Sequence, residues 1–177
     1  MESENSSDSF EENAKIKDNI IKLFEQFYDV KMCDSKPFFA EAIFRSHEEQ
    51  FVFVRSARIA ESESNEYVFF CETKHLCEET VRDFSMQAWN SGLSRVKPHF
   101  SHRNSDVLLV IISKTVDEKA QKICKKLHFS KSYCFSLKGW SDFRLCVLET
   151  STSRVFFNRL GKDVSKSIQK SIQKMDL

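Results

Sequence analysis

The feature that most constrains the fold is an uninterrupted apolar run, Val107-Leu108-Leu109-Val110-Ile111-Ile112. A strand that faces solvent on one side alternates apolar and polar residues, whereas a strand covered on both faces is apolar throughout. The run is short and rich in β-branched residues, which favours a strand over a helix. We therefore predict that residues 107–112 form the central strand of a sheet with cover on both faces.

Apolar spacing predicts the other elements around this strand. Helical spacing covers four segments, which begin near Ala14, Leu76, Thr115 and Lys162. The segment Thr115-Val116-Asp117-Glu118 has the pattern of a capping box, in which Thr115 would cap a helix. Alternating or continuous apolar spacing predicts strands over 38–45, 51–59, 67–71, 107–112, 132–137, 143–149 and 154–158.

The predicted element order is α-β-β-β-α-β-α-β-β-β-α, with short connections. Hairpins dominate this order, and only the strands that flank the third helix could form a parallel crossover. The fold class is therefore α+β: a single layered domain with a mixed or mainly antiparallel sheet and flanking helices.

Three parts of the chain are expected. Residues 1–13 are acidic and Ser-rich without periodicity, which predicts a disordered leader. Residues 14–161 form the α+β domain. Residues 162–177 form a basic helix whose apolar stripe is narrow, because Val164, Ile168 and Ile172 recur only every four residues. We expect this helix to dock lightly, so that truncation after Gly161 costs little stability.

Composition excludes several classes of protein. The three glycines, Gly92, Gly139 and Gly161, are far apart, so no glycine-rich phosphate loop or nucleophile elbow can be built. The net charge of +1 argues against a strongly basic nucleic-acid binder. There is no apolar run of about 18 residues that could cross a membrane. No export signal is evident, so the six cysteines are expected to be reduced thiols in the cytoplasm.

The strongest catalytic candidate is Glu72-Thr73-Lys74, at the end of a predicted strand. The opening element order together with this E-x-K resembles the restriction-endonuclease-like nucleases. That resemblance implies Mg²⁺ held by Glu72 and a second carboxylate, with Lys74 stabilising charge at the attacked phosphate. The second strand supplies no acidic partner, so Asp106 is the candidate for that role. A polar strand end without chemistry is the alternative interpretation.

The strongest binding candidates lie in the loop before the central strand. His99 and His102, with Asp106 beyond them, could ligate a metal, but a catalytic zinc needs three tight protein ligands. A Pro-containing loop does not fix the geometry of the two rings, and we expect neither a metal nor another cofactor. Around them the loop is basic and includes Phe100, a combination that can bind an anion or a nucleic-acid backbone. An ordinary solvated loop is the alternative. The basic residues in question are Arg95, Lys97 and Arg103. Trp140, in a turn after Gly139, is either a core anchor or part of a partner surface.

Three segments resemble an uncharacterised family of small prokaryotic α+β domains. They are residues 94–102, 137–141 and 158–161, within a similarity that covers roughly residues 36–164. The resemblance implies no catalytic residue. It directs attention to the His99/His102 loop and the turn at Gly139 and Trp140.

The function that these observations favour is an interaction module without catalysis of its own, and whether it is an enzyme stays open. A protein partner or a second copy of the chain is the expected ligand. Nucleic acid is a less favoured partner that is not excluded, and no membrane contact is expected. The alternative is a metal-dependent phosphodiesterase that uses Glu72 and Lys74.

Overall fold

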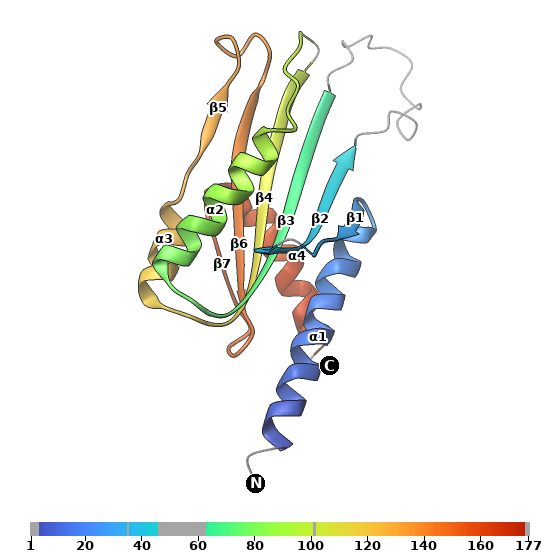
Figure 1. The fold of residues 1–177 in the computed structure, drawn as a ribbon, viewed down its shortest axis with the longest axis vertical. Helices are drawn as coiled ribbons and strands as arrows, with labels where there is room; N and C mark the ends of the chain where they lie inside the picture. Colours follow the sequence, from blue (N-terminus) through green and yellow to red (C-terminus); the bar gives the residue numbers. More distant parts are fainter. Residues whose placement is uncertain (1–3, 35, 46–62, 101, 176–177) are drawn as a thin grey trace.

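The computed structural model describes residues 4–34, 36–45, 63–100 and 102–175. These residues form one sheet with helices on both faces (Figure 1). The elements in chain order are α1 (Glu4–Glu25), β1 (Asp29–Met32), β2 (Phe38–Arg45), β3 (Glu63–Leu76), α2 (Glu78–Leu93), β4 (His102–Val116), α3 (Glu118–Lys126), β5 (Ser130–Ser132), β6 (Trp140–Glu149), β7 (Arg154–Phe157), the 3₁₀ turn η2 (Arg159–Gly161) and α4 (Lys162–Gln173). The α+β class is confirmed.

The sheet is mixed, with parallel pairs at its centre. The strand order is β1-β2-β3-β4-β6-β5, and β7 pairs with β6. The pairs β3/β4 and β4/β6 are parallel, whereas the four other pairs are antiparallel. Two crossovers therefore exist, one through α2 and one through α3. The expectation of a parallel crossover only around the third helix is wrong, because β3 and β4 also run in the same direction.

The run at residues 107–112 lies in β4, and its central position is confirmed. All six residues are buried, and β4 is paired along both of its edges. Val107, Leu109 and Ile111 belong to one apolar cluster, and Leu108, Val110 and Ile112 belong to the other. Because successive side chains of a strand point to opposite faces, this division shows cover on both sides.

One face of the sheet is covered by α2 and α3. The rings of Trp89, Phe129 and Phe143 contact one another there, with centroids 5.1–6.2 Å apart. Gly92 lets α2 lie directly on β4, because a Cβ at this position would be 2.4 Å from a methyl group of Val107. This face is built from apolar contacts.

The opposite face is covered by α1 and α4. Ile16, Ile20 and Phe24 of α1 are buried against the sheet, as the predicted stripe of this helix requires. In α4, Ile168 is 0% exposed and Ile172 is also buried. The helix is thus docked more deeply than its narrow stripe predicts. The effect of removing it stays a prediction.

Several element boundaries differ from those that the pattern predicts. β1 was not anticipated, and β5 is displaced, because residues 133–139 form turns. β3 is longer than the predicted strand at 67–71 and has fourteen residues. Helix α1 begins at Glu4, so the backbone of residues 4–13, expected as a disordered leader, is helical. The strand predicted at 51–59 lies outside the described residues.

Candidate functional site

The two segments that the sequence singles out lie at one end of the sheet. The loop of residues 94–100 precedes β4, and the turn of residues 133–139 joins β5 to β6, both at the top of Figure 1. Parallel pairing places Asn104 of β4 opposite Trp140 of β6. We call this surface the tip and define it by the side chains Phe100, Phe135, Leu137, Lys138 and Trp140.

His102 joins the two segments of the tip. Its Nδ1 lies 2.7 Å from the carbonyl oxygen of Lys138, and its Nε2 lies 2.8 Å from Oγ of Ser105. A carbonyl only accepts, so Nδ1 donates to Lys138, while Nε2 and the Ser105 hydroxyl form the second hydrogen bond. Because the ring is buried and both nitrogens are bonded, His102 is a structural residue here and not a free metal ligand. His99 lies beside it, with ring centroids 6.1 Å apart.

The turn between β5 and β6 has an uncommon backbone. Cys134, Phe135 and Ser136 have φ angles of 49°, 53° and 68°, which are left-handed values that side chains with a Cβ disfavour. Backbone bonds hold this turn, among them Lys138 N–H to the Tyr133 carbonyl at 3.1 Å and Tyr133 N–H to the Gly139 carbonyl at 2.9 Å. Residues that the surrounding structure holds in unfavourable backbone conformations are found most often at functional sites.

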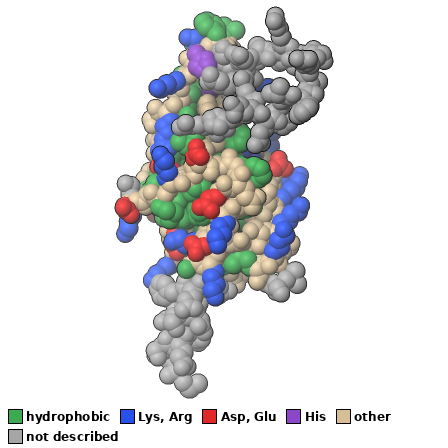
Figure 2. Space-filling model, turned by 90° about the vertical axis from the view of Figure 1, so that its right-hand side faces the viewer, with side chains coloured by type: hydrophobic (Ala, Val, Ile, Leu, Met, Phe, Trp, Pro, Cys, Tyr) green, Lys and Arg blue, Asp and Glu red, His purple; other side chains and the backbone are tan. Residues whose placement is uncertain are grey.

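The tip exposes apolar side chains to water. Phe135, at the apex of the turn, is 99% exposed, while Phe100 is 83% and Leu137 70% exposed. The Nζ of Lys138 lies 5.2 Å from the centroid of the Phe100 ring. Figure 2 shows hydrophobic side chains at the top of the molecule, next to His and Lys or Arg side chains. Grouped exposed apolar residues mark interaction surfaces more often than scattered ones do.

The basic residues of the predicted loop do not act as one group. The Arg95 guanidinium turns back onto the domain, where it binds the Glu41 carboxylate at 2.5 Å and lies over the Phe69 ring. Lys97 and Arg103 are exposed. Arg95 is thus structural, and the cations near the tip are Lys97, Arg103 and Lys138.

The carboxylates of the nuclease hypothesis do not converge. In the parallel register of β3 and β4, Glu72 pairs with Ile112, whereas Asp106 pairs with Glu66. The six positions from 106 to 112 correspond to about 20 Å along the strand, which is too far for two ligands of one Mg²⁺ ion. The Glu72 carboxylate is instead bound by Lys17 Nζ at 2.5 Å. Among the described residues, no group of His, Cys, Asp or Glu is arranged to hold a metal ion.

A buried polar network, which sequence analysis missed, lies under α1. The carboxylate of Glu66 accepts hydrogen bonds from the Tyr28 hydroxyl and the Arg144 guanidinium, and Arg144 Nε donates to the Leu160 carbonyl at 3.1 Å. Burial raises the pKa of neighbouring Asp106; a hydrogen bond from Asn104 opposes this, and the charge of Glu66 adds to it. The network joins the segment after α1, at Tyr28, to β3, β6 and η2. No local pattern reveals it, because its members are distant in sequence.

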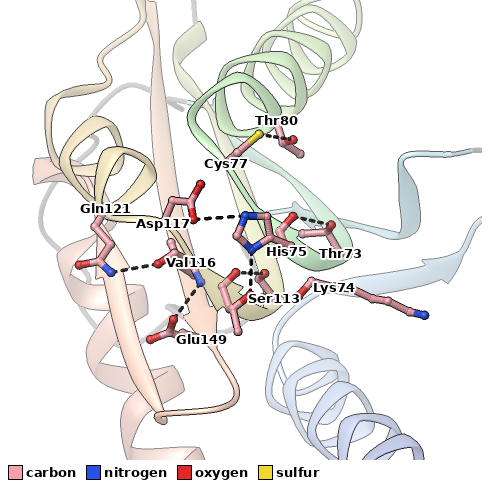
Figure 3. Close-up of polar contacts among 11 residues, drawn as sticks. Thr73, Lys74, His75, Cys77, Thr80, Ser113, Val116, Asp117, Gln121 and Glu149 are labelled. Atoms are coloured by element: carbon pink, nitrogen blue, oxygen red, sulfur yellow. Dashed lines mark hydrogen bonds and ion pairs between the residues drawn. The ribbon is translucent and has the colours of Figure 1, made fainter.

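A second polar group lies where β3 and β4 end (Figure 3). The His75 ring lies between Asp117, with Nε2 3.2 Å from Oδ1, and Thr115, with Nδ1 2.9 Å from Oγ1. Thr115 is thus not a helix cap: it belongs to β4, and Asp117 is the N-cap residue of α3. The predicted capping box is wrong because β4 extends as far as Val116. These exposed contacts connect the end of β3 to the end of β4.

Cys77 and Glu149 flank this polar group (Figure 3). Cys77 is the N-cap of α2, and hydrogen bonds from the side chain and then the backbone of Thr80 lower the pKa of its thiol. Its thiol lies beside the Thr80 hydroxyl at the start of the helix. Burial raises the pKa of Glu149, but hydrogen bonds from Thr152, Arg154 and the Val116 N–H outweigh burial and leave it lowered. Burial raises the pKa of the Cys124 thiol to about 12, so that thiol stays protonated.

The described residues form a single α+β domain with a mixed seven-stranded sheet. The chain belongs to the family described as a domain of unknown function (DUF8052), whose model matches residues 12–170. The resemblance to an uncharacterised family is thereby confirmed, over a longer range than the sequence segments indicate. No curated protein and no solved structure matches the chain. No helix among the described residues has the length and hydropathy to span a membrane.

Proposed function

We propose that this chain is an interaction module without catalysis of its own, which binds a protein partner through the tip. The observation that carries the proposal is Phe135, which is 99% exposed on a turn whose backbone is held by hydrogen bonds. A flexible loop could turn such a ring inward, but this turn holds it in water. A partner with an apolar pocket would remove the ring from water on binding.

The cations near the tip support a partner with acidic residues around its pocket. Lys97 and Arg103 are exposed in or next to the segments that carry the tip, and Lys138 lies over the Phe100 ring, which is consistent with the polar rim of a protein interface. The free cysteines are consistent with a reducing compartment, and we propose that the chain acts in the cytoplasm.

Site-specific photocrosslinking tests the proposal. A photoreactive residue at Phe135 is compared with one at Phe27, a phenylalanine outside the tip that is also exposed. We expect position 135 to form a defined adduct in an extract of the source cells. Excess unlabelled wild-type chain should suppress this adduct, and excess Phe135→Asp should not. Light scattering of the purified chain then shows whether the partner is a second copy.

Equal crosslinking from positions 27 and 135, or an adduct that the Phe135→Asp competitor suppresses as well as the wild type does, would overturn the proposal. Circular dichroism of Phe135→Asp serves as the folding control. This substitution lies on the surface, so the fold should be retained.

A further inference from the structure

A small basic pocket lies between the end of α3 and η2. Its volume is about 200 Å³, and its lining residues are Lys125, Lys126, Leu127, His128, Asn158, Arg159 and Leu160. It shares no residue with the tip, and it meets the buried polar network only at Leu160, whose carbonyl accepts from Arg144. Four of the seven lining side chains can carry a positive charge, and none is acidic.

Among the described residues, some surface cations have ion-pair partners and others do not, and the cations of the pocket belong to the second group. Arg82 pairs with Glu78, and Lys122 pairs with Glu118. Within the part of the chain that the structure describes, Lys125, Lys126 and Arg159 form no ion pair. The pocket therefore carries about three uncompensated positive charges.

The helix dipole explains only part of this charge. Lys125 and Lys126 lie in the last turn of α3, where cations are favoured by the helix carbonyls. His128 and Arg159 lie outside that helix, and Arg159 comes from a different part of the chain. The helix dipole does not explain why His128 and Arg159 line the same pocket, whereas binding of an anionic ligand explains it.

The framework of the pocket is fixed before any ligand binds. Asn158 is buried, and its Nδ2 donates to the carbonyls of Leu127 at 3.2 Å and Phe143 at 2.9 Å. Its Oδ1 accepts from the backbone N–H groups of Leu145 at 3.0 Å and Gly161 at 2.9 Å. All hydrogen-bonding positions of this amide are therefore used, and the two walls of the pocket are tied together. A fixed framework lowers the cost of ordering on binding.

We propose that this pocket binds the phosphoryl group of a small phosphorylated molecule. A phosphoryl group carries nearly two negative charges and three acceptor oxygens, which suits a pocket lined by one arginine and two lysines. A carboxylate carries a single charge, which one arginine can satisfy. A nucleic-acid strand is less suited, because strand-binding grooves are longer and place aromatic rings along the path, and the lining residues include no Phe, Tyr or Trp.

Titration followed by backbone amide NMR tests this site. The probes are inorganic phosphate, phenyl phosphate, sodium chloride and a short single-stranded oligonucleotide, added to the wild-type chain. We expect saturable shifts at the amides of Leu127, His128 and Gly161 with both phosphate compounds. Arg159→Ala should weaken their binding about tenfold, since it removes a charge-assisted hydrogen bond. Lys31→Ala is the matched control: it removes one exposed positive charge from β1 and should leave binding unchanged.

Three results would overturn the proposal. One is shifts that are not saturable or that sodium chloride reproduces at the same ionic strength, because these would indicate screening by salt. Another is equal weakening by Arg159→Ala and Lys31→Ala. The third is an oligonucleotide that binds more tightly than phenyl phosphate, which would assign the pocket to nucleic acid. Arg159 is exposed, so an unchanged unfolding midpoint for Arg159→Ala should confirm that the variant is folded.

Discussion

The two faces of the sheet bury their side chains by different means. The face under α2 and α3 is closed by apolar side chains, with Trp89 and Phe143 at its centre. The face under α1 and α4 has an apolar centre as well, but Glu66 and Arg144 form a buried ion pair at one end of it. Apolar contacts adjust to substitutions of similar volume, whereas a buried ion pair fails when either partner is removed. The face under α1 and α4 therefore depends in part on a few polar contacts, and the face under α2 and α3 on shape.

The largest effect is expected on the apolar face. Ile111→Asp places a carboxylate where the side chain is completely buried. An isolated buried charge costs several kcal/mol, which approaches the whole stability of a domain, about 5–15 kcal/mol. The variant should be unfolded by circular dichroism, and Ile111→Val should cost only about 1 kcal/mol. A folded Ile111→Asp variant would contradict the central placement of β4.

The next effect concerns the ion pair on the opposite face. Arg144→Ala leaves the Glu66 carboxylate buried without its cation, and we expect a loss of about 3–5 kcal/mol in urea unfolding. Arg82→Ala is the control, because its pair with Glu78 lies on the surface, where it contributes about 0.5 kcal/mol or less. If Arg144→Ala and Arg82→Ala both lower the free energy of unfolding by the same small amount, the two faces do not differ in the way described.

A third substitution measures how much the packing of α4 on the sheet contributes to the free energy of unfolding. Ile168→Ala removes a completely buried side chain, and denaturant unfolding should show a loss of about 3 kcal/mol. Val164→Ala on the same helix is the control and should cost less, because Val164 is only partly buried. A loss near zero for Ile168→Ala would restore the expectation of a lightly docked helix.

The smallest effect depends on pH and concerns Asp106. Because burial raises the pKa of this carboxyl above its ordinary 3.8, the folded chain holds more protons than the unfolded chain just above that pH. The contribution of Asp106 to stability therefore falls as pH rises through the folded-state pKa. Asp106→Asn should be more favourable at pH 7 than at pH 3, by a fraction of the Arg144→Ala effect. A Ser64→Ala variant, which leaves the charge intact, should lack this pH dependence.

The sequence predicts the features of the fold that depend on a local residue pattern. It misses the features that depend on contacts between residues far apart in the chain. The run at 107–112 identifies the central strand because six consecutive apolar residues indicate burial on both faces of the sheet. The parallel partner of β4 is not evident, since register with β3 depends on how the chain crosses back through α2. The deep docking of α4 is missed for a related reason. An apolar stripe shows which side of a helix is apolar, but not how much apolar surface of the sheet that side covers.

The candidate site was predicted in part. The loop with His99 and His102 and the turn with Trp140 were singled out separately, and only the structure shows that His102 connects them. Phe135 and Leu137 were interpreted as strand residues, because positive φ angles at Cys134, Phe135 and Ser136 have no signature in these residue types. Glu66 could not be paired with Tyr28 and Arg144, since the three lie 38 and 78 positions apart.

The arrangement of β4 between β3 and β6 has a consequence for the speed of folding. Neither neighbour is joined to β4 by a hairpin, so the centre of the sheet cannot form by zipping outward from a turn. The chain must first close a loop through α2 or α3, and this loss of entropy comes before the strand contacts compensate for it. We expect folding in milliseconds to seconds, slower than that of helical domains of this size, with α2 already packed on β3 and β4 at the rate-limiting step.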